Sequence, residues 1–186
     1  MRFVNDNGAL VCYNNGEMLR IEAWGRDSLR VRSTMLGKFT GNGWALTEAT
    51  AKTEPSVKVE LVDHWVGNGD IDKREMATII NGRIKAVVNF VGIISFYRDD
   101  KLVLREYFRM YDGTISRGSR CLKVVNREWK GVIGGTEYSL NVKFDPNPGE
   151  KIFGMGQYQD RHLNKKGSVL ELAHRYPWVV AAVGIH

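Results

Sequence analysis

The sequence has few of the residues that mark several common classes of protein. Its 186 residues include only two cysteines, Cys12 and Cys121, and neither lies in a C-x-x-C pair. A disulfide framework is therefore not expected, and two reduced thiols are typical of a cytoplasmic protein. The N-terminus has no apolar run of signal-peptide length, and no segment reaches the roughly 18 apolar residues of a membrane span. We therefore expect a cytoplasmic protein with no membrane partner.

Patterns that bind metals and cofactors are also missing. The four histidines show no H-x-x-x-H spacing and have no neighbouring cysteine, so no metal site is expected. The stretch "GMGQYQ" from Gly154 begins like a dinucleotide fingerprint, but Gln159 stands where the third glycine should be. Such a fingerprint also requires a βαβ unit, which the sequence does not show. We expect no cofactor.

The net charge of +6 does not gather in one place. The 27 lysines and arginines are scattered, with Arg30 and Arg32 alternating with apolar residues and Lys165-Lys166 forming only a pair. Alternation of this kind is typical of the exposed face of a sheet, whereas a nucleic-acid site needs a basic patch or stripe. We therefore expect no nucleic-acid partner.

Alternating apolar and polar residues dominate what is present. Period two is the mark of a strand with one buried face, and it recurs in "SLRVRSTM", "VKVELV", "IKAVVNF" and "EYSLNVKF". The clearest hairpin is "IISFYRDDKLVLREYFRM", where two apolar runs flank a turn at Asp99-Asp100. The weakest assignment is Asp70 to Ile80, which fits either a helix or a strand.

The fold class predicted is all-β, a large antiparallel β-sandwich in one domain. Turn signals separate strand-length runs at Asn14-Asn15-Gly16, Gly41-Asn42-Gly43, Gly67-Asn68-Gly69, Asn81-Gly82, Gly134-Gly135 and Asp145 to Gly149. The residues expected in the core are Phe90, Phe96, Val103, Leu140, Val142 and Phe144.

No catalytic constellation can be read from spacing. The serines lie in no G-x-S-x-G elbow, and Cys12 has no evident base beside it. Carboxylates that could serve glycoside chemistry are Glu106, Asp112, Asp160 and Glu171, but spacing alone does not pair them. Aromatic and polar residues mix in "GMGQYQDRHLNKKG", as a sugar site would require, although packing of Phe153 and Tyr158 in the core or at an edge is the favoured explanation of the aromatics.

The segment from Asp145 to Arg175 resembles the N-terminal β-sandwich domain of the family 31 glycoside hydrolases, the retaining α-glucosidases and α-xylosidases. The family's phrase "ekiYGlGqy…l…kG…leL.hRN" is similar to Phe153 to Tyr158, Leu163, Lys166-Gly167, Leu170 to Leu172 and His174-Arg175. Looser similarity extends back to about Met18, through "LRVR" and the hairpin at Asp99. The resemblance implies a sandwich like that of the galactose-mutarotase superfamily.

In that family the chemistry belongs to a (β/α)8 barrel that follows the sandwich, with one Asp as nucleophile and a second carboxylic acid as proton donor. The resemblance therefore implies no catalytic residue here. It implies that Arg175 and His174 face substrate, an α-linked glucoside or xyloside, and that Gln157 and Tyr158 shape the interface with the barrel. An arginine suits substrate contact because its planar fork offers several fixed donors.

After Arg175 the sequence departs from the family pattern. "RYPWVVAAVGIH" brings Pro177 too early and matches the expected "Ss.GYG" phrase poorly. We therefore expect a sandwich domain over 1–175 and a divergent or truncated tail over 176–186, produced by a deletion, a frameshift or a shortened form of the protein.

Three functions are compared. The first is a non-catalytic domain that supports the absent barrel and lends a loop to its sugar pocket. The second is a free-standing carbohydrate-binding or protein-interaction module. The third, a mutarotase-like enzyme, needs a histidine base and is disfavoured by the sparse histidines. A domain separated from its barrel should also expose an apolar patch, which a homodimer could cover.

Overall fold

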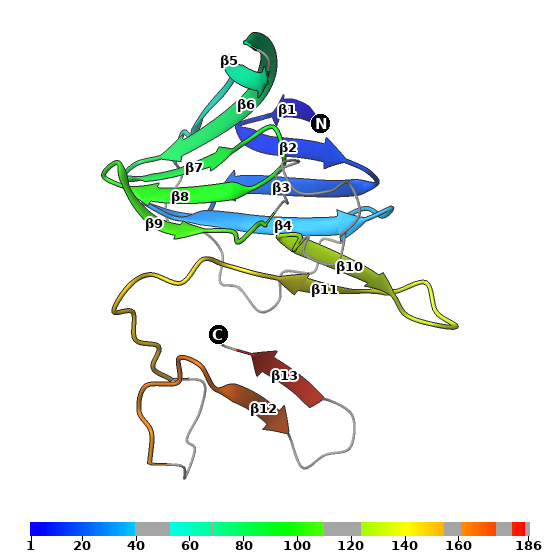
Figure 1. The fold of residues 1–186 in the computed structure, drawn as a ribbon, viewed down its shortest axis with the longest axis vertical. Helices are drawn as coiled ribbons and strands as arrows, with labels where there is room; N and C mark the ends of the chain where they lie inside the picture. The colour runs from blue at the N-terminus through cyan, green and yellow to red at the C-terminus, as the bar shows by residue number, and fades with distance from the viewer. Residues whose placement is uncertain (40–52, 68, 110–123, 155–160, 174–179, 185–186) are drawn as a thin grey trace. The chain divides into compact units, whose positions relative to one another are not determined.

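All regular elements in the described part of the chain are β-strands. A computed structural model describes residues 1–39, 53–67, 69–109, 124–154, 161–173 and 180–184. Its thirteen strands form four antiparallel sheets (Figure 1). The chain divides into two compact units, Met1–Asp145 and Pro146–His186. The prediction of an all-β antiparallel fold is confirmed.

The first sheet of the larger unit has four strands in sequence order. They are β1 (Arg2–Asp6), β2 (Ala9–Asn14), β3 (Glu17–Ala23) and β4 (Leu29–Met35). Two-residue turns join the first three: Asn7-Gly8 has φ of 50° and 84°, and Asn15-Gly16 has 48° and 85°. Paired positive φ values match the twist of a hairpin, and Asn-Gly adopts them most readily. The chain therefore folds back twice with a fixed register.

The second sheet of the larger unit has five strands, also in sequence order. They are β5 (Ser56–Gly67), β6 (Asp70–Asn81), β7 (Ile84–Val88), β8 (Ile94–Arg98) and β9 (Lys101–Arg105). The predicted hairpin at Asp99-Asp100 is confirmed, with φ of 49° and 61° at these two residues. The ambiguous stretch from Asp70 is a strand, which pairs with β5 from Asp70 to Ile80 and with β7 from Ala77 to Asn81.

The hydrophobic core lies between these two sheets (Figure 1). Buried side chains come from alternate positions of β2, β3, β6, β7 and β8, namely Leu10, Cys12, Leu19, Ile21, Ala77, Ile79, Ala86, Val88 and Ile94. Asn81 joins the sheets at one end, since its amide donates to the carbonyl oxygens of Gly25 (2.8 Å) and Ser28 (2.7 Å). Burial of this polar side chain is tolerated because it is hydrogen-bonded.

The predicted core was correct in only part of the sandwich. Phe96 packs against the core cluster, and Phe90 is half-buried. Val103, Leu140, Val142 and Phe144 were wrong, because their side chains are 36–46% exposed. Leu140 and Val142 do alternate on a strand, β11 (Tyr138–Val142), but β11 pairs only with β10 (Arg127–Gly131) in a separate two-stranded sheet. The alternation of apolar and polar residues identified the strand, but it does not show whether a second sheet packs against the strand's apolar face.

The smaller unit contains one hairpin. β12 (Val169–Ala173) pairs antiparallel with β13 (Val180–Gly184). The described part of the predicted divergent tail, residues 180–184, is the strand β13. No helix in the described ranges is long and apolar enough to cross a membrane.

Candidate functional site

The four residues that sequence reasoning proposed for function, Gln157, Tyr158, His174 and Arg175, all lie outside the described residues. The same holds for the predicted turn at Gly41-Asn42-Gly43. Their roles stay predictions.

The described part of the family-like segment is organised around Asn164. Its Oδ1 accepts hydrogen bonds from the backbone N–H groups of Ile152 (3.0 Å) and Lys166 (3.2 Å). The N–H of Lys165 donates to the Ile152 carbonyl at 2.7 Å, which adds a backbone hydrogen bond between the same two parts of the segment. Gly167 has φ of 80°, a conformation that strongly favours glycine. The lysine–glycine step of the motif therefore forms a turn directly before β12.

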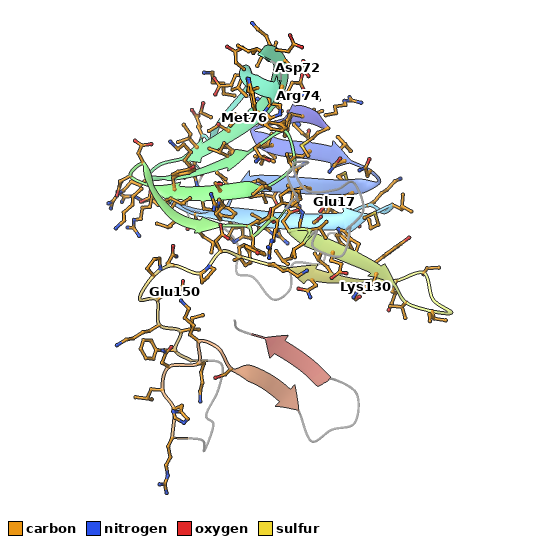
Figure 2. The ribbon with its side chains drawn as sticks, in the orientation of Figure 1. Glu17, Asp72, Arg74, Met76, Lys130 and Glu150 are labelled. Atoms are coloured by element: carbon orange, nitrogen blue, oxygen red, sulfur yellow. The ribbon has the colours of Figure 1, made fainter. Side chains whose placement is uncertain are left out.

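A buried ionic network joins Arg127, Glu17 and Glu106. Arg127 on β10 donates to Glu17 Oε1 from Nε (2.6 Å) and to both carboxylate oxygens of Glu106 from Nη1 (2.6 and 2.5 Å). The side chains of these three residues are 6%, 10% and 3% exposed. Figure 2 shows Glu17 on β3. The network therefore ties the first sheet to β10 and to the segment after β9.

Neighbouring groups add further hydrogen bonds to one oxygen of each carboxylate, Glu17 Oε1 and Glu106 Oε2. Glu17 accepts from Ser33 Oγ (2.6 Å) and Trp129 Nε1 (3.3 Å). Glu106 accepts from Asn126 Nδ2 (2.6 Å) and from the Ile94 N–H (2.9 Å). Burial of this kind is stable only when charges are paired and hydrogen-bonded.

Burial and the neighbouring charged partners shift the pKa values of Glu17 and Arg127 in opposite directions. Burial raises the pKa of the Glu17 carboxyl, but the hydrogen bond and charge of Arg127, with hydrogen bonds from Ser33 and Trp129, outweigh it and hold that pKa below 4.5. Burial lowers the pKa of Arg127, and the two glutamates raise it by more. The charged forms of Glu17 and Arg127 are therefore favoured in the folded protein.

Glu106 was one of the carboxylates considered for glycoside chemistry, and the structure assigns it a different task. Its oxygens are fully engaged by Arg127, Asn126 and the Ile94 backbone. A glycosidase acid or nucleophile must instead reach a bound sugar. Sequence reasoning missed Glu17 and Arg127 altogether, because each occupies an ordinary polar position at the start of a strand.

The outer face of the first sheet presents a second, more exposed group of charges. Arg20 on β3 donates to Asp6 on β1 (2.6 Å) and to Glu22 (3.0 Å). Glu22 in turn lies 2.9 Å from the guanidinium of Arg32. Because strand register places Arg20 directly opposite Val11 and Arg32, this chain of ion pairs runs across the sheet.

A cavity of about 470 Å³ opens on this same face. The residues that line it are Val4, Asn5, Asp6, Val11, Tyr13, Met18, Arg20 and Phe39. Among the described residues no group of three or more metal-ligating side chains is found.

The chain is similar in sequence to two known proteins that are named as glycosidases. No family model matches it. It is 36% identical over 183 residues to the uncharacterized family 31 glucosidase ORF2 of Pseudescherichia vulneris, covering 90% of this chain and 32% of that protein. It is also 41% identical over 46 residues to α-xylosidase A of Aspergillus niger, covering 25% of this chain and 6% of that enzyme.

Solved structures give the same result. A GH31 α-xylosidase from a soil metagenome, crystallised with xylose, is 38% identical with a TM-score of 0.72, over 94% of this chain and 25% of that one. A xylosidase from Aspergillus niger shares the fold at 24% identity, with a TM-score of 0.60 over 88% of this chain and 22% of that one. The chain thus spans about a third or less of these relatives.

The fold and the sequence similarity together identify the chain as a β-sandwich domain like those found in glycosidases. More narrowly, the chain corresponds to the N-terminal β-sandwich domain of a family 31 glycoside hydrolase.

Proposed function

We propose that this chain is a non-catalytic domain that supports the (β/α)8 barrel of a family 31 α-glycosidase and lends a loop to its sugar pocket. The enzyme it serves would hydrolyse α-linked glucosides or xylosides. The observation that supports this most is the pattern of coverage. Identity of 36–38% extends over at least 90% of this chain but over no more than 32% of the relatives.

Exposed apolar side chains on the described surface favour a supporting role. Leu61, Trp65 and Ile71 are 64–69% exposed on the long β5–β6 hairpin, and register places them on the face that continues the core side of the sheet. The β10–β11 hairpin adds Leu140, and its turn adds Ile133, which is fully exposed. A group of exposed apolar side chains such as that on the β5–β6 hairpin is typical of a surface that contacts another protein domain.

Activity of the isolated chain tests the proposal. The purified 186-residue protein is assayed on chromogenic α-glucoside and α-xyloside, with a complete family 31 α-xylosidase as the positive control. We expect no turnover by the chain. Hydrolysis that co-purifies with it and survives a second purification step would contradict the non-catalytic role.

Self-association follows from the same exposed surface. We propose that the isolated chain forms a homodimer that covers the apolar residues of the β5–β6 hairpin. Sedimentation velocity over a range of concentrations should show dimer in the parent protein and monomer in the Leu61→Ser/Trp65→Ser variant. A parent protein that stays monomeric at the highest concentration would contradict this.

A further inference from the structure

We infer that the Asn15-Gly16 turn between β2 and β3 is a site of spontaneous deamidation, and that the fold makes it more reactive than the other Asn-Gly steps that the structure describes. The sequence has five such steps, of which Asn7-Gly8, Asn15-Gly16 and Asn81-Gly82 lie within the described residues. This modification is separate from the proposed supporting role, because every group that it uses belongs to the larger unit.

Deamidation at such a step is an attack of the next backbone nitrogen on the asparagine side-chain amide. A bond forms between the Gly16 nitrogen and Asn15 Cγ, the Cγ–Nδ2 bond breaks, and ammonia leaves with the proton of the Gly16 nitrogen. The product is a cyclic imide. Water then adds to one of its two carbonyls, which leaves either aspartate or isoaspartate at position 15. The net change consumes water and releases ammonia, and it requires no other reactant.

The turn conformation gives the nitrogen a route to Cγ. With φ of 48° at Asn15 and 85° at Gly16, the step has the paired positive φ values of a type I′ turn. Rotation of the peptide plane between these residues gives type II′, in which ψ of the first residue is about −120° and turns the Gly16 nitrogen toward Asn15 Cγ. Gly16 accepts the negative φ of type II′ as readily as its present one. Its carbonyl, which accepts from the Leu36 N–H (2.8 Å), belongs to the next peptide plane and is not turned.

Neither reacting group of this step has a partner in the described part of the chain. Asn15 and Gly16 are both exposed. Among the described residues no hydrogen bond is found for the Asn15 side chain or for the Gly16 N–H. The amide that leaves is therefore open to water, and the attacking nitrogen loses no hydrogen bond to protein when its peptide rotates.

Asn7-Gly8 is the closest comparison, and it is restrained. Its φ values of 50° and 84° are nearly those of Asn15-Gly16. The Gly8 N–H, however, donates to Asn5 Oδ1 at 3.0 Å, and the Asn7 amide donates to Asp6 Oδ1 at 3.2 Å. Rotation of the peptide between Asn7 and Gly8 would break the first of these bonds. We therefore expect Asn7 to react more slowly than Asn15.

Asn81 is restrained more strongly. Its side chain is 2% exposed, and its amide donates to the carbonyl oxygens of Gly25 and Ser28. Attack on its Cγ requires both hydrogen bonds to break, and a buried polar group left without a partner is costly. The expected order of reactivity is therefore Asn15, then Asn7, then Asn81.

Modification of the turn should reach the buried ionic network. Asn14 pairs with Glu17 across the turn, and Glu17 Oε1 accepts from Arg127 Nε at 2.6 Å. An isoaspartate routes the backbone through its side chain, which adds a methylene to a two-residue turn. Because turn length fixes the register of a hairpin, we expect the position of Glu17 to be disturbed.

Incubation of the 186-residue chain at pH 8 and 37 °C, followed by peptide mapping with mass spectrometry, tests the inference. Conversion of amide to acid is followed at each of the three steps. We expect the rate at Asn15 to exceed that at Asn81 by about tenfold or more, with Asn7 between them. In guanidinium chloride the three rates should be similar, because glycine follows each asparagine and the fold no longer restrains any of them.

The variant Asn5→Ala separates the effect of the hydrogen bond from that of the local sequence. It removes the acceptor of the Gly8 N–H, so it should raise the rate at Asn7 toward that at Asn15 and leave the rate at Asn15 unchanged. Folded protein in which Asn7 or Asn81 reacts as fast as Asn15 would overturn the inference. So would an Asn7 rate that Asn5→Ala leaves unchanged.

Chemical denaturation tests the effect on Glu17. The isoaspartate form, separated after incubation, should unfold at a lower denaturant concentration than the variant Asn15→Asp, which has the same charge on a normal backbone. Equal midpoints would contradict the disturbance expected at Glu17. Because neither experiment measures turnover, both results are independent of the proposed supporting role.

Discussion

Arg127 and Glu106 are joined by two hydrogen bonds of 2.6 and 2.5 Å between a single guanidinium nitrogen and both carboxylate oxygens, in a site where their side chains are 6% and 3% exposed. Arg127 also holds Glu17 on the first sheet, and its Nη2 donates to the carbonyl of Gly92 (2.9 Å). One side chain of β10 thus connects the two-stranded sheet to segments of both halves of the sandwich.

Replacing this arginine should therefore destabilise the whole larger unit. Arg127→Met leaves two carboxylates buried without their cation, and loss of one partner of a buried ion pair costs about 3–5 kcal/mol. Chemical denaturation monitored by tryptophan fluorescence measures the change. Arg83→Met is the control, because the Arg83–Asp99 pair is about half exposed and solvent screens it. Equal effects of the two substitutions would contradict the role assigned to Arg127.

The Glu17 carboxyl should make stability depend on pH in the acid range. Its pKa is below 4.5 in the folded state, so the folded state binds fewer protons than the unfolded state as pH falls. The stability that the ionised Glu17 carboxyl contributes is therefore present above pH 4.5. It is lost as the pH falls through the pKa that this carboxyl has in the folded state. Denaturation midpoints measured from neutral pH to pH 3 should fall less steeply for Glu17→Gln.

Glu128→Gln serves as the comparison for this experiment. The pKa of Glu128 is also lowered, chiefly by the charge of Lys130, but this carboxyl is exposed to solvent. Its substitution should change the acid profile less than Glu17→Gln does. A parent profile that shows no loss of stability below pH 4.5 would disagree with the burial and pairing of Glu17.

The thiol of Cys12 should be unreactive in the folded protein. Cys12 is 2% exposed, and burial raises its pKa to about 12, with a smaller opposing effect of Arg127. Because the thiolate is the reactive form, a chromogenic disulfide reagent at pH 8 should not modify it. The assay uses a Cys121→Ser background, so that Cys12 is the only thiol. It should react on addition of guanidinium chloride, and rapid reaction without denaturant would show that the core between the sheets is open.

Gly82 should be intolerant of any side chain. It has φ of 61° in the turn between β6 and β7, and a Cβ there would overlap Asp27 Oδ1, which accepts a hydrogen bond from the Arg83 N–H at 2.8 Å. Gly134→Ala is the matched control, since Gly134 has φ of 80° but nothing within 4 Å of an added Cβ. Both variants carry the backbone strain of a positive φ. Thermal unfolding should show a larger loss for Gly82→Ala, and equal losses would argue against the contact with Asp27.

Local pattern was sufficient to predict the strands and several of their turns. Alternation placed strands at Leu29 to Met35 and Ile84 to Val88, and the Asp99-Asp100 pair marked its hairpin, because these features depend on neighbours in sequence. The core assignment failed at Leu140 and Val142 because alternation identifies a face without identifying what covers it. The residues of the buried network are up to 110 positions apart, from Glu17 to Arg127, and no local signal connects them.

A chimera tests the central claim most directly. In the soil-metagenome α-xylosidase, the quarter of the chain that matches this protein is replaced by residues 1–186, and hydrolysis of a chromogenic α-xyloside is measured. If this chain is a supporting domain, the chimera should retain turnover, and Arg127→Met within it should reduce the yield of active enzyme. A chimera that folds with the circular dichroism and melting behaviour of the parent enzyme yet hydrolyses no α-xyloside would contradict the claim.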